Sequence, residues 1–335
     1  MSLHPQGESR RAARRDRGAA DALDAGNGGL AAGMLAALAA LLLLLAAPFA
    51  LYPVFLMKVL CFALFACAFN LLIGYAGLLS FGHAAFFGGA AYVTAHTVKE
   101  WGLPPELGVL LGTGAAAGMG LVFGLLAIRR QGIYFAMITL ALSQMVFFLA
   151  LQLPFTHGED GIQAVPRGLL FGLFDLSQPL TMYYTVLAIF VGGFAIIWRT
   201  VHSPFGQVLT AIRENEPRAV SLGYRTERYK LLAFVLSATL AGLAGGTKAI
   251  VFQLASLTDV TWQMSGEVVL MTLLGGMGTL SGPVVGATLV VTLESYLAAT
   301  SLPVPVVIGC IFVVCVLLFR RGIAGEILAR VHRRP

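Results

Sequence analysis

Charged side chains are scarce in this sequence. Asp, Glu, Lys and Arg make up 11% of the 335 residues, and hydrophobic residues make up 58%. Soluble domains carry about 25% charged residues. No region is long and polar enough to form a separate soluble domain. The composition therefore excludes a soluble globular protein and predicts a polytopic membrane protein.

Motifs for catalysis and metal binding are also missing. The phosphate-binding pattern G-x-x-x-x-G-K-[ST] and the zinc pattern H-E-x-x-H do not occur. The segment from Gly77 to His83 resembles G-x-S-x-G but is one residue too long, so we expect no catalysis by Ser80 and His83. Four cysteines stand in apolar segments without a C-x-x-C pair. We therefore expect a chain that is not an enzyme, with no metal, no cofactor of its own and no nucleic-acid partner.

Ten apolar segments approach the roughly 20 residues that a transmembrane helix needs. They cover residues 30–51, 53–73, 77–98, 105–128, 132–153, 180–198, 230–252, 263–276, 283–299 and 303–319. The eighth is short and the ninth begins with a Gly-Pro pair, so either could be re-entrant. The predicted fold class is all-α, a polytopic membrane helix bundle with about 8–10 transmembrane or re-entrant segments.

The basic residues are distributed unevenly around these segments. If the N-terminus is cytoplasmic, 18 of the 22 Lys and Arg residues fall on the cytoplasmic side. Cytoplasmic loops of membrane proteins carry such an excess. We therefore predict a disordered basic tail over 1–29, a membrane domain over 30–320, a basic tail over 321–335, and both termini in the cytoplasm.

Residues 199–230 form the most polar loop and hold nine of the 38 charged residues. Ser203 and Pro204 read as an N-cap and first helical residue. Four apolar residues then follow at helical spacing: Phe205, Val208, Leu209 and Ile212. Pro217 opens a second short turn and Gly223 is a natural helix stop. The pattern predicts an amphipathic helix that either binds a soluble partner or lies on lipid headgroups.

The stretch 70–95 places polar residues and glycines at membrane depth. Glycines here weaken a helix, and broken helices are tolerated where they line a pathway. The polar residues are Asn70, Ser80 and His83, and the glycines are Gly74, Gly77 and Gly82. The pattern G-x-x-G-x-L-S in this stretch occurs again over 275–281, either as an internal repeat or, as we favour, as shared turn chemistry.

Few ionisable residues lie within the predicted spans. Glu267, Glu294 and Lys248 are either transport residues or markers of span ends. The longest predicted extracytoplasmic loop, 153–179, contains an acidic Gly-rich stretch from Thr156 to Ile162. This stretch either docks a soluble partner or only forms a turn.

Taken together, six segments resemble the LivM-type permease of branched-chain amino acid ABC importers over about residues 50–320. They are NLLIGYAGLLSFGHAAFFGGAAYV, GIYFAMITLALSQM, the T-x-G-x-D-G-I turn at 156–162, SPFGQVLTAIRENEPRAVSLGY, YKLLAFVLSATLAGLAGG and LLGGMGTLSGPVVGA. The resemblance implies a permease for hydrophobic amino acids in the bacterial inner membrane. It also implies three kinds of partner besides membrane lipid: a second homologous permease, two cytoplasmic ATPases that bind ATP, and a periplasmic substrate-binding protein.

The resemblance assigns roles to named residues. Loop 199–230 would couple to the ATPases through Phe205, Val208, Leu209, Ile212, Arg213, Glu214, Glu216, Ala219 and Gly223. The substrate pathway would involve Asn70, Gly74, Gly77, Ser80, Gly82 and His83. The binding protein would dock at Thr156, Gly158, Asp160 and Gly161.

The sequence also departs from the family pattern. Of the importer motif E-A-A-x-x-x-G, only Ala219 and Gly223 match, and His157 stands where a glycine is expected. The same family includes permeases for urea, short amides and other small solutes. A further alternative is an ion-coupled transporter that acts alone and uses Glu267 or Glu294 as its coupling acid.

Overall fold

The structure is a computed structural model that describes residues 39–298 and scattered positions between 306 and 326. It divides into two compact units, Met1–Tyr52 and Pro53–Pro335, which we describe separately. In the first unit, a helix over residues 39–46 continues into the 3-10 turn η1 (Ala47–Phe49). The predicted tail 1–29, the start of the predicted span 30–51, and most of the span 303–319 and the tail 321–335 lie outside the described residues.

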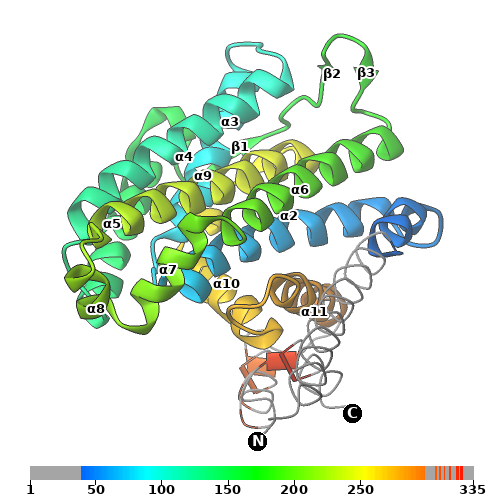
Figure 1. The fold of residues 1–335 in the computed structure, drawn as a ribbon. Helices are drawn as coiled ribbons and strands as arrows, with labels where there is room; N and C mark the ends of the chain where they lie inside the picture. The colour runs from blue at the N-terminus through cyan, green and yellow to red at the C-terminus, as the bar shows by residue number, and fades with distance from the viewer. Residues whose placement is uncertain are drawn as a thin grey trace, which may run out of the picture. The chain divides into compact units, whose positions relative to one another are not determined.

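The second unit is a bundle of helices (Figure 1). Its elements are α2 (Pro53–Asn70), the π-helical turn η2 (Leu71–Tyr75), α3 (His83–Lys99), α4 (Pro105–Ala127), α5 (Ile133–Gln152), η3 (Pro154–Thr156), η4 (Gly158–Asp160), β1 (Ile162–Gln163), β2 (Leu169–Leu170), β3 (Phe174–Asp175), α6 (Pro179–Val201), α7 (Pro204–Glu214), α8 (Glu216–Ser221), α9 (Thr226–Phe252), β4 (Leu254–Ala255), η5 (Leu257–Val260), α10 (Trp262–Gly275) and α11 (Gly282–Leu297). The strands are two residues long and pair antiparallel, β1 with β4 and β2 with β3. The predicted all-α membrane bundle is therefore confirmed.

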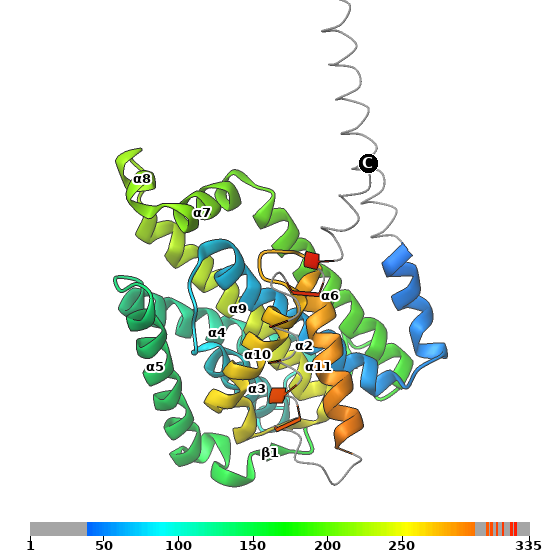
Figure 2. The same cartoon turned by 90° about the horizontal axis from the view of Figure 1, so that it is seen from below.

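Among the described residues, five helices are long and apolar enough to cross a membrane: α2 with η2, α4, α5, α6 and α9. The first and last of these are mostly buried, whereas fewer than half of the residues in the apolar stretches of α4, α5 and α6 are buried. A helix that is apolar on all sides suits a position surrounded by other helices, which is where α2 lies (Figure 2). The exposed apolar faces of α4, α5 and α6 suit contact with lipid.

Helix α3 is shorter than the apolar segment predicted for it, and α10 and α11 are shorter than a full membrane span. The segment 77–98 was expected to be one span, but its helix begins only at His83, because residues 77–82 are not helical. Helices α10 and α11 contain 14 and 16 residues. These lengths fall below the roughly 20 residues of a membrane span, and they suit the re-entrant alternative.

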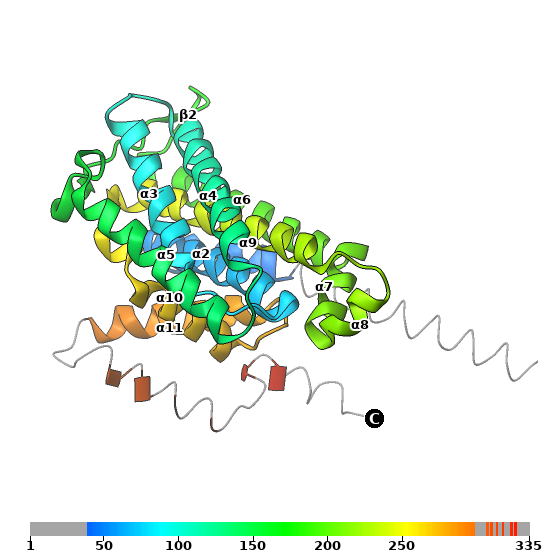
Figure 3. The ribbon, with the colours of Figure 1, turned by 90° about the vertical axis from the view of Figure 1, so that its left-hand side faces the viewer.

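The bundle has two distinct ends (Figures 1 and 3). One end carries α7 and α8 together with the non-helical segments 77–82 and 276–281. The other end carries the β1–β4 ladder and the β2–β3 hairpin, and we call it the hairpin end. The loop before α5 reaches the first end, because the Gln131 side chain donates a hydrogen bond to Glu216 at 2.7 Å.

Small residues let α9 approach α3 closely. A Cβ atom added to Gly245 would overlap the backbone carbonyl oxygen of Phe87. Close approach of backbones through glycine is a common basis of helix packing in membranes. At Gly118, on the exposed side of α4, an added Cβ would meet nothing within 4 Å.

We predict that Gly245→Ala destabilises the protein, because α3 and α9 must separate to admit the methyl group. The cost is expected in the range of about 1–3 kcal/mol, as for other overpacked cores. Thermal unfolding in mild detergent measures the effect, with Gly118→Ala as the matched control. Equal melting temperatures for the two variants would contradict the close contact.

Candidate transport site and coupling segment

The helix break that the sequence predicts at 70–83 lies between α2 and α3. Helix α2 ends in the π-helical turn η2, and residues 77–82 are extended or bent before α3 begins. Gly77 has a φ of 71°, which a residue with a side chain rarely adopts. This break frees backbone groups that need hydrogen-bond partners.

Asn70 supplies partners across the bundle. Its side-chain nitrogen donates to the Thr279 carbonyl at 2.8 Å, and its side-chain oxygen accepts from the Gly278 N–H at 3.0 Å. A Cβ atom on Gly74 would lie 2.7 Å from the Gly278 nitrogen. The two G-x-x-G-x-L-S segments are therefore in contact, and we call residues 74–82 and 275–281 the paired loops.

Ser80 and His83 have separate hydrogen-bond partners. The Ser80 hydroxyl accepts from the Gly82 N–H at 3.1 Å, whereas His83 Nε2 lies 2.9 Å from the Ser237 hydroxyl on α9. The His83 ring is fully buried and makes edge contacts with Phe69. Of the six predicted pathway residues, five are buried within this chain and only Gly77 is exposed.

We call residues 199–230 the coupling segment, after the role that the resemblance assigns to them. The segment contains two capped helices, α7 and α8. The Ser203 hydroxyl accepts from the Gly206 N–H at the start of α7, as the sequence predicts. The Asn215 side chain caps α8 in the same way through the Arg218 N–H at 3.1 Å. Gly223, with a φ of 89°, follows the last turn of α8. The two N-caps are supplied by residues of the segment itself and fix where α7 and α8 begin.

The apolar face of this segment packs on the chain itself. Leu209, Ile212 and Ala219 are buried, and the Phe205 ring stacks on Tyr229 of α9 with centroids 5.6 Å apart. The predicted residue Val208 is half-buried beside them. The sequence pattern identifies this apolar face correctly but does not reveal what covers it.

Two polar residues of the segment bond to the bundle: Arg213, although exposed, and the half-buried Glu216. Arg213 Nη1 donates to the Gly74 carbonyl oxygen. The Glu216 carboxylate pairs at 2.6 Å with the ammonium group of Lys230, which is buried on α9. Glu214 remains exposed. Large apolar side chains are exposed later in the segment, at Val220 (54%), Leu222 (69%) and Tyr224 (42%).

The predicted docking turn forms part of the hairpin end. Thr156 is buried and donates to the Leu153 carbonyl at 2.8 Å, and Gly161 is packed closely against Ala255. His157 has φ 60° and ψ 22°, the left-handed conformation that explains why a glycine is expected there. Gly158 is likewise left-handed, with φ 61°.

Among the four residues assigned to docking, only Asp160 exposes its side chain, beside an exposed Glu159. The other three therefore shape the turn, and the two acids form its accessible surface together with the exposed His157.

Lys248 has a structural partner that sequence reasoning missed. Its ammonium group lies 2.8 and 2.6 Å from the two carboxylate oxygens of Asp259, and both residues are buried. Asp259 also closes a capping box with Ser256 at the start of η5. The available signal was an acidic residue shortly after a helix that carries a lysine near its end. This pair ties α9 to η5 at the hairpin end.

The other membrane acids lie together. The Glu267 carboxyl on α10 lies close enough to Glu294 on α11 for the two groups to interact electrostatically. Glu294 also pairs with Lys58 of α2 at 3.5 Å. These contacts join α2, α10 and α11.

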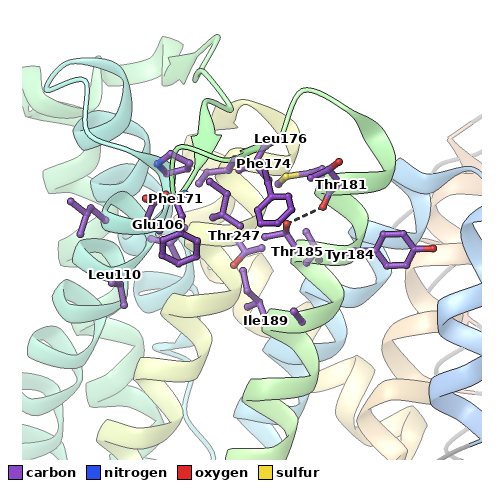
Figure 4. Close-up of a pocket in the computed structure, with 18 of the residues that line it drawn as sticks. Glu106, Leu110, Phe171, Phe174, Leu176, Thr181, Tyr184, Thr185, Ile189 and Thr247 are labelled. Carbon is purple, nitrogen blue, oxygen red and sulfur yellow. Dashed lines mark hydrogen bonds between the residues drawn. The ribbon is translucent and has the colours of Figure 1, made fainter.

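A cavity of about 870 Å³ lies beneath the β2–β3 hairpin, between α4, α6 and α9 (Figure 4). Its walls are mainly apolar, and Phe171, Phe174 and Leu176 of the hairpin segment close its upper side. The Glu106 carboxylate accepts from the Phe171 N–H at 3.2 Å and so holds the hairpin over the cavity. None of the predicted pathway residues lines it. In the sequence, the only indication of this cavity is the group of apolar residues in loop 169–176.

We predict that Asp259→Asn destabilises the protein by about 3–5 kcal/mol, because it leaves the buried Lys248 ammonium without a counter-charge. The double variant Lys248→Met, Asp259→Leu is expected to regain most of the loss. Unfolding in detergent measures both, and Asp160→Asn, an exposed acid at the same end, is the control. A double variant no more stable than Asp259→Asn would contradict a structural ion pair and favour a transport role for Lys248.

Comparison with known proteins places this geometry in a family. The family model described as the permease component of branched-chain amino acid transport systems matches residues 52–319. The high-affinity branched-chain amino acid transport permease protein LivM of Escherichia coli is 30% identical over 250 residues, which cover 66% of this chain and 58% of LivM. The LivM protein of Salmonella typhimurium is 31% identical over 245 residues, with the same shares.

The chain therefore spans less than two thirds of the length of these LivM proteins. The ribose import permease protein RbsC of Bacillus subtilis is also similar, at 28% identity over 66% of this chain and 70% of RbsC. No solved structure matches the chain. The extent of the family match shows that this chain belongs to the family of branched-chain amino acid transport system permease components.

Proposed function

We propose that this chain is the transmembrane permease subunit of an ATP-driven importer for branched-chain, hydrophobic amino acids. The observation that carries the proposal is the coupling segment. It consists of two capped helices between α6 and α9, and it exposes apolar side chains at one end of a membrane bundle whose sequence has no phosphate-binding loop. Such a segment provides an attachment point for a separate ATPase.

The amino acid substrate rests on the family model and on the similarity to LivM. Relatives named as ribose and autoinducer 2 permeases also match, at 27–28% identity. Urea, short amides and other small solutes are the alternative cargo. Uptake assays with leucine, ribose and urea in parallel distinguish these cargo classes.

The proposed partners are a second homologous permease, two cytoplasmic ATPases that bind ATP, and a periplasmic substrate-binding protein. The complex would lie in the bacterial inner membrane, with both termini of this chain in the cytoplasm. Asp160 and Glu159 provide the accessible acidic surface for the binding protein. Non-helical backbone in a membrane bundle is tolerated where it lines a pathway, so the paired loops stay our proposed position for the substrate path.

We assign the surface of the coupling segment that contacts an ATPase from the solvent exposure of its side chains. Because Leu209, Ile212 and Ala219 are buried on the bundle, they hold the segment in place. The exposed large apolar residues of the segment lie on and just after α8: Val220, Leu222 and Tyr224. With the exposed carboxylate of Glu214, they form a mixed apolar and polar surface suited to a groove on a partner.

We predict that the double variant Val220→Asp, Leu222→Asp abolishes recovery of ATPase subunits with the tagged protein in mild detergent, because two charges replace the apolar contact. Mass spectrometry of the purified complex measures recovery. Leu173→Asp, an exposed residue of the β2–β3 hairpin at the opposite end, is the control and is expected to retain the ATPases.

Two results would overturn the proposal. The wild-type protein could purify without any ATPase and transport alone in liposomes under a proton gradient. Glu267 and Glu294 would then become the residues to test, as in an ion-coupled transporter. Alternatively, full ATPase recovery with the double variant would remove Val220 and Leu222 from the contact surface.

A further inference from the structure

We infer that Arg213 is the positioning residue through which the coupling segment holds the paired loops and transmits its movement to them. The inference rests on the proposed function and adds the step between the cytoplasmic helices and the membrane bundle. It also changes the role of this residue, because the sequence resemblance alone assigns Arg213 to contact with an ATPase.

The Arg213 side chain crosses from α7 to both paired loops. Its stem runs over Gly77, where an added Cβ would lie 2.7 Å from Arg213 Cγ. Its Nη1 atom donates to the Gly74 carbonyl and lies 3.4 Å from the position that a Cβ of Gly278 would occupy. One side chain of the coupling segment therefore contacts the 74–82 loop and lies beside Gly278 of the other loop.

The contact satisfies a need created by the end of α2. The last carbonyl groups of a helix have no partner within the helix and carry the negative end of its dipole. Gly74 lies in the final turn, η2, and no helix continues beyond Ala76 to supply its partner. A guanidinium group offers a fixed positive charge and several N–H donors in one plane, so it suits this position.

The glycines make room for this arrangement. A methyl group at Gly77 would displace the Arg213 stem, and one at Gly74 would collide with the backbone of Gly278. Small residues at these positions are therefore explained by the passage of Arg213 and by the contact between the loops. A pathway lined by these glycines is not needed to account for them.

Asn70 makes the two loops move together. Because its amide bonds to both Gly278 and Thr279, a displacement of the Gly74 region carries the 275–281 loop with it. The second polar anchor of the segment, Glu216 with Lys230, is on α9 and does not involve either loop. Arg213 is thus the polar side chain that links α7 to the helix break, while Glu216 fixes the neighbouring α8 to the bundle.

The test uses the complete transporter, purified with its partner subunits and reconstituted in liposomes and nanodiscs. We compare Arg213→Met with Arg213→Lys and with Arg228→Met. Arg228→Met removes the same charge from an exposed position at the start of α9, where the side chain has no hydrogen bond or ion pair within the described residues. Three quantities are measured: recovery of ATPases, ATP hydrolysis and leucine uptake.

For Arg213→Met we expect normal recovery of the ATPases and continued hydrolysis, but uptake reduced about tenfold, within the range of coupling between linked sites. Arg213→Lys, which keeps a charge and a donor, is expected to recover part of the uptake. Hydrogen exchange with and without ATP plus vanadate provides a readout of transmission. The nucleotide-dependent change in residues 74–82 is expected to disappear in Arg213→Met but to persist in residues 204–221.

Other outcomes would overturn the inference. Uptake within about twofold of wild type in Arg213→Met would show that the contact is not needed for coupling. Loss of the ATPases in Arg213→Met, with their retention in Arg228→Met, would make Arg213 a direct partner contact instead. Failure of the proposed function is recognised separately, because the wild-type protein would then bring down no ATPase at all.

Discussion

Buried backbone groups must find hydrogen-bond partners inside the protein, and this constraint governs the break between α2 and α3. Where α2 ends, its last carbonyls and the N–H groups of the nearby loops have no partners within a helix. Asn70, at the end of α2, forms hydrogen bonds with the backbone of the 275–281 loop, and Arg213 of α7 donates one to the Gly74 carbonyl. The break is thus stabilised by segments that lie far from it in the sequence, and one of them is the proposed handle for ATP-driven movement.

Helix α9 is held near both ends by ion pairs of buried lysines. Lys230 pairs with Glu216 near its start, and Lys248 pairs with Asp259 near its end. Between them, small residues such as Gly245 let the helix lie directly against α3. Helix α9 is therefore a rigid central element, against which the paired loops and the peripheral helices are arranged.

Much of the fold could be predicted from the sequence because apolar length and capping chemistry are local. The spans at 105–128 and 132–153 agree with α4 and α5 to within a residue, and the Ser203 cap forms as expected. What could not be predicted depends on distant partners. An apolar face at Leu209 and Ile212 is compatible with packing on an ATPase or on the chain's own bundle, and the sequence does not distinguish the two. The sequence also does not show that Lys248 pairs with Asp259, because the pair forms only in the folded chain. Asn70 likewise looks like a pathway residue until its partners, 208 and 209 residues further on, are known.

The same separation has a consequence for how the chain is made. Helix α2 is among the first elements of its unit to enter the membrane, whereas Gly278 and Thr279 are among the last described elements of the chain to be synthesised. Until they arrive, the buried amide of Asn70 lacks its native partners. Contacts so far apart in sequence are slow to form. The α2 region therefore reaches its native hydrogen bonding only late in biogenesis, and the nascent bundle must tolerate an unsatisfied polar group for most of its synthesis.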